Sequence, residues 1–208
     1  MAAPLVNRVE AARLLEAGGV LLMATDTLPG LHARMDRPEA LARISEIKQR
    51  DPAKPLLLLA ASLDAVADVA TLTPRQRSYA ERCWPGPYTL ILPALPELPR
   101  DVTTDDDTVA VRVPGMSGLR KLLADVGVPV VSTSANRSGE VPDPTLAAAT
   151  EIFRETVDGV YDPGGGAEAI STRPSALVDL TVWPPLILRE GPCASPDVAG
   201  LDLPPGGF

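Results

Sequence analysis

Histidine is almost missing from this sequence, and that shortage limits the chemistry open to it. The single histidine is His32, and no G-x-S-x-G segment occurs, which disfavours a Ser-His-Asp hydrolase triad. The two cysteines, Cys83 and Cys193, are far apart and form no CxxC pair, so with one histidine they cannot build a usual structural zinc site. We therefore expect no protein-bound metal. The cysteine spacing fits a reducing compartment.

Two further absences concern the binding of nucleotides and nucleic acids. The pattern G-x-x-x-x-G-K-[ST] does not occur, so a P-loop would not hold phosphate. Aromatic residues make up only 3% of the chain, so we do not expect nucleic-acid binding through stacking of bases on aromatic side chains. The net charge is −8 and the pI is about 4.7. Such an acidic balance argues against a protein that coats nucleic acid or an anionic membrane, because both tasks need an excess of basic residues.

Long apolar runs are also missing. The longest early run, residues 19–24, is far shorter than the roughly 20 residues of a membrane span, and no basic segment precedes it as in a secretory signal. We expect a cytoplasmic protein without membrane association. The chain has 208 residues, 45% of them hydrophobic, which suits one compact domain. We place this domain at residues 1–191, followed by a Pro/Gly-rich tail at 192–208 that we expect to be loose or surface-draped.

Apolar periodicity and turn residues predict a series of helices and strands. One helix start is marked by a capping box, Thr73-Pro74-Arg75-Gln76, with proline at its first position. The predicted helices cover residues 9–17, 37–50, 62–70, 73–83, 117–126 and 145–156, and the predicted strands cover 20–24, 56–60, 88–92, 108–113, 128–134, a segment near 160, 176–180 and 186–189. Helices and strands alternate early and strands cluster late, which indicates an α/β fold with a mixed sheet and helices packed on it.

Polar side chains occupy strand positions where apolar residues are the usual alternative. In residues 108–113, alternation places Thr108 and Arg112 on one face and the three valines on the other. An arginine at such a position needs an anion. That anion is either a bound ligand or the nearby acidic run at residues 105–107, and Arg112 alone does not decide between them.

Other polar groups follow strand ends. Ser132 and Ser134 share one side of the predicted strand 128–134, and Asn136 comes after them. The carboxyl ends of strands are where open α/β sheets usually bind small molecules, although a serine-rich turn is an equal alternative. Residues 25–27, Thr-Asp-Thr, follow the first strand in the same way.

A group of basic residues lies at the end of the second predicted helix. Lys48, Arg50 and Lys54 fall at or just past its C-terminus. They either interact favourably with the helix dipole or form a cluster for phosphate or carboxylate.

Taken together, seven segments resemble the YrdC-like family, whose members include threonylcarbamoyladenylate synthases. They occur in the family's order over residues 5–191, and although each is weak alone, the ordered set is specific. The segments are Thr25-Asp26-Thr27-Leu28-Pro29-Gly30-Leu31; Lys48-Gln49-Arg50 with Lys54-Pro55-Leu56; Trp84-Pro85-Gly86-Pro87-Tyr88-Thr89-Leu90; Val109-Ala110-Val111-Arg112-Val113-Pro114; Ser132-Thr133-Ser134-Ala135-Asn136-Arg137-Ser138-Gly139; Pro174-Ser175-Ala176-Leu177-Val178-Asp179-Leu180; and Leu188-Arg189-Glu190-Gly191.

The resemblance implies a twisted mixed parallel and antiparallel sheet with flanking helices around a basic cavity, in a short, single-domain form of the enzyme. It also implies roles for individual residues. By the resemblance, Lys48 and Arg50 are catalytic. Thr27, Ser132 and Ser175 contact L-threonine, and Arg112 binds its carboxylate. The residues that contact ATP are Arg50, Lys54, Thr108, Ser134, Asn136, Asp143 and Arg189. Asp143 stands where the family often has a serine.

The implied reaction joins L-threonine, bicarbonate and ATP into L-threonylcarbamoyladenylate and pyrophosphate, with Mg²⁺ entering with ATP. The family passes this adenylate to a transferase complex that modifies an adenosine of tRNA, and weak direct binding of tRNA or other RNA stays open. Two departures from the family pattern affect the pocket. Ala24 and Leu28-Pro29 replace Pro and Val-Tyr, and Leu59 stands where longer relatives often have a histidine.

Two alternatives stay open. One is a non-catalytic RNA-binding or ribosome-maturation module on the same fold, which the acidic balance disfavours. The other is a carbamoyl-transfer enzyme that uses carbamoyl phosphate, as in hydrogenase-maturation relatives. Those relatives carry further domains, for which we expect no room in this chain.

Overall fold

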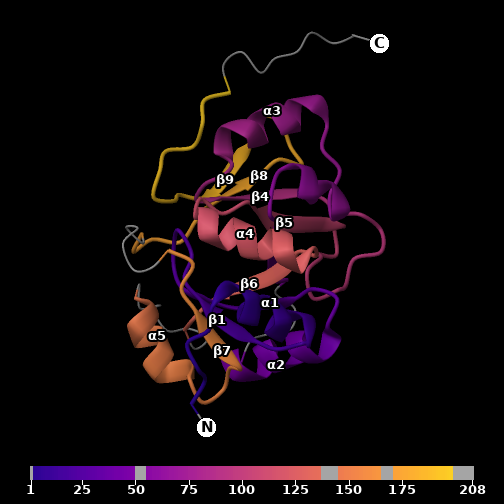
Figure 1. Ribbon diagram of the computed structural model, residues 1–208. Helices are drawn as coiled ribbons and strands as arrows, with labels where there is room; N and C mark the ends of the chain where they lie inside the picture. The colour runs from indigo at the N-terminus through magenta and orange to yellow at the C-terminus, as the bar shows by residue number, and fades with distance from the viewer. Residues whose placement is uncertain (1, 50–54, 137–144, 165–170, 199–208) are drawn as a thin grey trace.

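A mixed sheet forms the centre of the molecule. The computed structural model describes residues 2–49, 55–136, 145–164 and 171–198. Within them the strand order is β7-β1-β2-β6-β3-β5-β4-β8-β9 (Figure 1). The strands are β1 (Leu21–Met23), β2 (Gly30–Arg34), β3 (Leu57–Leu59), β4 (Tyr88–Pro93), β5 (Thr108–Arg112), β6 (Val130–Ser134), β7 (Gly159–Tyr161), β8 (Ala176–Asp179) and β9 (Leu186–Arg189). Three strand pairs are parallel (β1 with β7, β3 with β5, β4 with β8) and the other five are antiparallel, which confirms the predicted mixed sheet.

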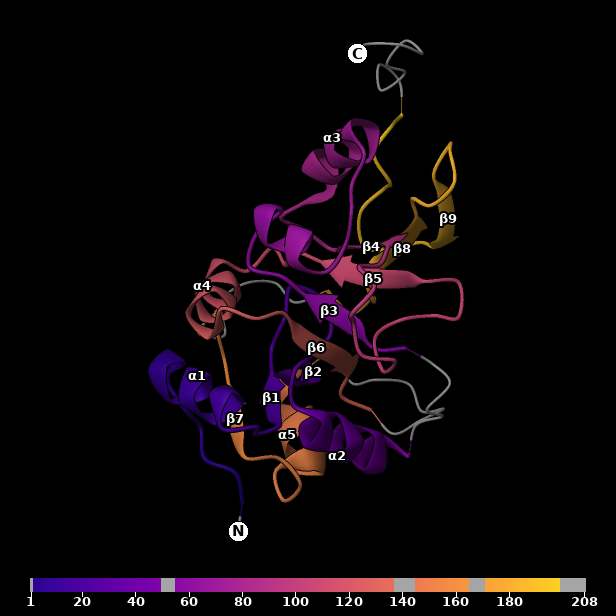
Figure 2. The same cartoon turned by 90° about the vertical axis from the view of Figure 1, so that its right-hand side faces the viewer.

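Helices flank this sheet. They are α1 (Arg8–Glu16), α2 (Pro38–Lys48), α3 (Pro74–Cys83), α4 (Ser117–Val126) and α5 (Leu146–Phe153), with a short 3₁₀ helix, η1 (Asp64–Asp68). Helices α1 and α4 pack side by side (Figure 2), and α2 lies against β2. Helix α3 lies near β8 and β9, at the end of the sheet far from α2 and α5 (Figure 1). None of the described helices reaches the length and hydrophobicity that a membrane span requires.

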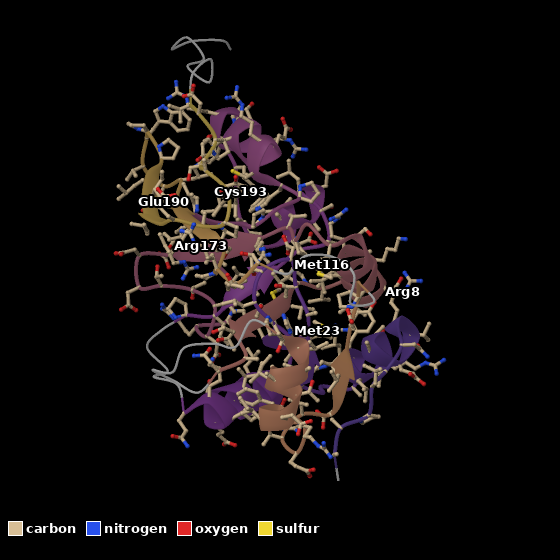
Figure 3. All side chains as sticks on the ribbon, turned by 90° about the vertical axis from the view of Figure 1, so that its left-hand side faces the viewer. Arg8, Met23, Met116, Arg173, Glu190 and Cys193 are labelled. Carbon is tan, nitrogen blue, oxygen red and sulfur yellow. The ribbon has the colours of Figure 1, made fainter. Side chains whose placement is uncertain are left out.

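The sheet separates two hydrophobic clusters. Alternation along β1 sends Leu22 into one cluster and its neighbours Leu21 and Met23 into the other. The cluster beneath α1 and α4 includes Met23 and Met116, both labelled in Figure 3. Aliphatic side chains dominate both clusters, as the low aromatic content requires.

Local sequence signals account for several helix ends. The predicted capping box is present, because the Thr73 hydroxyl accepts from the Gln76 N–H while the Gln76 side chain accepts from the Thr73 N–H. Helix α4 matches its predicted bounds and ends at Gly127, whose φ of 68° is a left-handed value that glycine adopts readily.

Two elements differ from the prediction. The helix predicted for residues 62–70 is only the 3₁₀ turn η1, because Ala70 pairs with Ala94 in an isolated β-bridge and so leaves the helical path. Strand β2 was not predicted at all, since Pro29-Gly30 is typical of a turn. In the structure Gly30 begins β2 between β1 and β6. A Cβ at Gly30 would lie 2.8 Å from the Thr133 carbonyl oxygen, so only glycine fits this close approach.

Candidate active site

A cavity of about 540 Å³ opens along the middle of the sheet. Seven strands contribute to it, together with the segment between β1 and β2. Six side chains predicted for the site line it, namely Thr27, Arg112, Ser132, Ser134, Ser175 and Arg189. The other lining residues are Thr25, Leu28, Gly30, Pro55, Leu57, Thr89, Ala110, Thr133, Thr172, Pro174 and Leu177. Residues from distant parts of the sequence therefore meet around one hollow of ligand size.

Arg112 is the most constrained of these residues. Strand β5 places it opposite the buried valines, as alternation predicted, and its side chain is 4% exposed. Its Nη1 donates to the Thr27 hydroxyl at 2.7 Å and its Nε donates to the Gly86 carbonyl at 3.3 Å. Its Nη2 forms an ion pair with Asp26. Among the described residues these bonds use one N–H on each Nη, and a guanidinium with a further N–H on each Nη can bind a carboxylate.

The anion beside Arg112 is therefore Asp26, and not the acidic run 105–107 that the sequence offered as an alternative. The second carboxylate oxygen of Asp26 accepts from the Gly115 N–H at 2.8 Å, which fixes the carboxylate from the far side. Burial lowers the pKa of Arg112, while the charge of Asp26 and its hydrogen bond oppose that shift. Sequence reasoning assigned no role to Asp26, although it lies between two threonines of one of the seven segments.

Hydroxyl groups form a second part of the wall. Thr25 donates to the Leu28 carbonyl at 2.8 Å and shares a 3.1 Å hydrogen bond with Thr27. Thr89 and Ser175, on neighbouring segments, share a buried hydrogen bond of 2.8 Å. These bonds fix several hydroxyls at the cavity, where they can meet the polar groups of a small ligand.

Ser132 differs from the other hydroxyls because a histidine lies behind it. The Ser132 Oγ is 3.1 Å from Nε2 of His32, which is fully buried on β2 directly opposite Ser132 on β6. Burial lowers the pKa of His32 to about 3. Its Nδ1 has no hydrogen-bond partner in the described part of the chain. Among the described residues no carboxylate contacts Nδ1, as a Ser-His-Asp triad would require.

Lys48 lies at the end of α2 and contacts the end of β6. Its Nζ donates to the backbone carbonyls of Ser134 and Asn136 and lies 3.2 Å from the Asn136 side-chain oxygen. The Ser134 hydroxyl also donates to that side-chain oxygen. Lys48, Ser134 and Asn136 thus form one hydrogen-bonded group, with Ser134 at the cavity wall.

The remaining predicted ATP contacts fall into three groups. Arg189 on β9 lines the cavity and donates from Nε to the Ser175 carbonyl at 3.0 Å. Thr108 shares the β5 face of Ala110 and Arg112, but it is not among the lining residues and its hydroxyl bonds to Thr104 at 2.8 Å. Arg50, Lys54 and Asp143 lie outside the described residues. The basic character expected of the cavity stays a prediction.

Comparisons with known proteins found a matching family and several similar proteins. The Sua5/YciO/YrdC family, described as "Telomere recombination", matches residues 13–191. A threonylcarbamoyl-AMP synthase of Pyrococcus abyssi is 37% identical over 183 residues, which cover 87% of this chain and 53% of that protein. The chain thus spans about half the length of this archaeal relative.

A bacterial relative and a solved structure extend the comparison. The threonylcarbamoyl-AMP synthase of Xanthomonas euvesicatoria is 37% identical over 166 residues, which cover 78% of this chain and 89% of that protein. The crystal structure of P. abyssi Sua5 complexed with L-threonine matches with a TM-score of 0.80 and 34% identity, over 88% of this chain and 53% of that one.

Proposed function

Because the chain belongs to the Sua5/YciO/YrdC family, we propose that it is an L-threonylcarbamoyladenylate synthase, which forms threonylcarbamoyl-AMP and pyrophosphate from L-threonine, bicarbonate and ATP. One observation carries this proposal: Arg112 lies within one cavity beside the hydroxyls of Thr27, Ser132 and Ser175. This set suits a small zwitterion that carries a hydroxyl. The L-threonine bound to the related P. abyssi protein supports the same substrate.

Arg112 would bind the threonine carboxylate. Its bonds to Thr27, Asp26 and Gly86 use three of its five N–H groups, so two would be available for the carboxylate oxygens. The threonine amine and hydroxyl would then face the hydroxyl wall formed by Thr27, Ser132 and Ser175. A cavity of about 540 Å³ falls inside the range of small-molecule sites and leaves room for part of a nucleotide.

The nucleotide would lie along the carboxyl end of β6 and the β9 side of the cavity. Ser134 and Arg189 line this part, and Lys48 is bonded to Ser134 and Asn136 there. Thr108 lies on the same β5 face as Arg112. We assign Arg50, Lys54 and Asp143 to the ATP on the resemblance alone.

The proposed reaction has two steps. The threonine amine adds to the carbon of CO₂ derived from bicarbonate and loses a proton, which yields a carbamate. A carbamate oxygen then bonds to the α-phosphorus of ATP, and the bond from that phosphorus to the bridging oxygen of pyrophosphate breaks. Repulsion between the anions is the main obstacle, so cationic side chains that hold both substrates supply the catalysis.

Mg²⁺ would enter this site with ATP and would neutralise phosphate charge there. The described residues contain no cluster of three His, Cys, Asp or Glu side chains that could hold a metal ion. The ion would therefore be held mainly by phosphate oxygens and water, a coordination that Mg²⁺ accepts readily.

The product would pass to a tRNA threonylcarbamoyl transferase complex in the cytoplasm, with weak direct binding of RNA as a further expectation. A decisive test incubates the protein with ATP, Mg²⁺, bicarbonate and L-threonine, follows pyrophosphate release and identifies the adenylate by mass. The matched control omits L-threonine. Folded protein that shows no threonine-dependent release would refute the proposal, and salt-dependent RNA affinity without turnover would favour the non-catalytic RNA-binding module.

A further inference from the structure

His32 is a buried titratable side chain that the proposed reaction does not use. It is fully buried and does not belong to the cavity lining, so a bound ligand would not touch it. Its Nε2 nevertheless lies 3.1 Å from the hydroxyl oxygen of Ser132, which does line the cavity. A polar ring in the core, one hydrogen bond behind a substrate-facing hydroxyl, needs a physical account.

Strand register explains how the two side chains meet. His32 on β2 is paired directly with Ser132 on β6, so their side chains share one face of the sheet. The imidazole also depends on Gly30, two residues earlier on that face. A Cβ at Gly30 would lie 2.9 Å from Cε1 and 3.2 Å from Nε2 of the ring. The glycine that begins β2 therefore leaves room for the histidine ring beneath the cavity.

The imidazole constrains the hydroxyl in either tautomer. Desolvation lowers the pKa of His32 to about 3, so the ring is neutral at physiological pH. A neutral imidazole has one N–H and one bare nitrogen, so Nε2 either donates a hydrogen bond to the Ser132 oxygen or accepts one from the Ser132 hydroxyl. If Nε2 donates, the Ser132 hydroxyl can donate its own hydrogen toward the cavity. If Nε2 accepts, the Ser132 oxygen is left to accept a hydrogen bond from a ligand in the cavity.

We propose that His32 is a positioning residue that sets the orientation of the Ser132 hydroxyl for L-threonine. This inference rests on the proposed function, and it assigns His32 no contact with substrate. A general-base role is the main competitor. A group that binds its proton so weakly makes a poor base near neutral pH, and no carboxylate among the described residues contacts Nδ1 to orient the ring for that task.

The test is a double-mutant cycle with His32→Met and Ser132→Ala. Methionine fills the site with an apolar chain of similar size but offers only a weakly accepting sulfur, and each single change should weaken L-threonine binding about fivefold, the usual value of one hydrogen bond. Binding is measured by calorimetry and KM by pyrophosphate release. If His32 acts through the hydroxyl, His32→Met should have almost no further effect in the Ser132→Ala background.

Two controls separate positioning from loosening of the fold. His32→Gln retains a nitrogen donor and an oxygen acceptor, so it should recover most of the affinity. Leu31→Val, a change in the adjacent core side chain on the opposite face of β2, should lower thermal stability without changing the affinity for L-threonine. For His32→Met, kcat should change less than KM.

The outcomes are distinct. Three results would overturn the inference: additive effects in the cycle, failure of His32→Gln to recover affinity, or an equal loss of affinity in Leu31→Val. The proposed function would still stand if the wild-type protein turned over its substrates. Wild-type protein that binds L-threonine with the expected coupling but releases no pyrophosphate would overturn the proposed reaction alone. Wild-type protein that binds no L-threonine would overturn both.

Discussion

Asp26 and Arg112, 86 positions apart in the sequence, form an ion pair at the wall of the cavity. The Arg112 side chain is 4% exposed and the Asp26 side chain 16% exposed, so both charges are largely removed from water. Their mutual attraction and the Gly115 N–H on the far side of Asp26 offset the cost of that desolvation. Each residue therefore depends on the other, and the free energy of unfolding should report this dependence.

Asp26→Asn should destabilise the protein by about 3 kcal/mol, because it leaves the buried charge of Arg112 without its counter-ion. Urea denaturation measures the change. The matched control is Asp64→Asn, which breaks the pair between Arg77 and Asp64 at 2.8 Å, where the two side chains are 48% and 85% exposed. That change should cost less than about 1 kcal/mol, as for other surface pairs. Equal losses in the two variants would contradict the burial argument.

Arg112→Lys should raise the KM for L-threonine at least about tenfold while the protein still folds. Lysine keeps the charge, but its ammonium cannot serve Thr27, Gly86 and Asp26 and also present two parallel donors to a carboxylate. Arg112→Ala should weaken threonine use further and should also destabilise the fold, because Asp26 then loses its partner. Steady-state kinetics and urea denaturation separate the two effects.

Arg189→Lys provides the matched comparison on the other side of the cavity. Arg189 lies on β9 and is assigned to the nucleotide, so this change should raise the KM for ATP more than that for L-threonine. The opposite pattern, with Arg189 controlling threonine and Arg112 controlling ATP, would reverse the assignment of the two ends of the cavity.

The sequence predicted most of this arrangement where the signals are local. Alternation along residues 108–113 placed Arg112 opposite the valines, and a capping box and a terminal glycine defined helix ends. The hydrogen-bond partners of the site residues could not be predicted from such local signals. Asp26 reaches Arg112 because the segment between β1 and β2 contacts the end of β5, and His32 reaches Ser132 because β2 pairs with β6.

Strand β2 shows the same limit. Pro29-Gly30 favours a turn by local rules, yet Gly30 pairs with both β1 and β6. Only glycine fits there, because the backbone of β6 and the His32 ring lie too close for a side chain. No local pattern encodes that crowding. Once β2 was missed, the pairing of His32 with Ser132 could not be seen, although both residues were singled out.

Ser175→Ala should destabilise the protein by about 1 to 2 kcal/mol, because it leaves the buried Thr89 hydroxyl without its partner. Adding Thr89→Val, which removes that hydroxyl at nearly constant shape, should recover part of the loss. Chemical denaturation of the two single variants and the double variant measures this coupling. If the double variant loses the sum of the two single effects, the 2.8 Å bond between the hydroxyls contributes little to stability.

His32 should make the protein less stable as the pH falls through the mildly acidic range. Its pKa in the folded state is about 3, against an ordinary value of 6.5, so below pH 6.5 the unfolded chain binds a proton that the folded protein does not. The stability gained from burying the neutral ring is therefore complete above pH 6.5 and is lost progressively toward pH 3. Between pH 7 and pH 5 the loss should be about 2 kcal/mol.

Because His32 is the only histidine, this part of the pH dependence can be assigned to it with one variant. The free energy of unfolding of His32→Gln, measured by urea denaturation at half-unit intervals, should be nearly flat from pH 7 to pH 5, since glutamine does not titrate. A wild-type curve equally flat over this interval would mean that the folded protein accepts the proton. The imidazole would then be protonated in the folded protein, and the positioning of Ser132 by a neutral ring would be wrong.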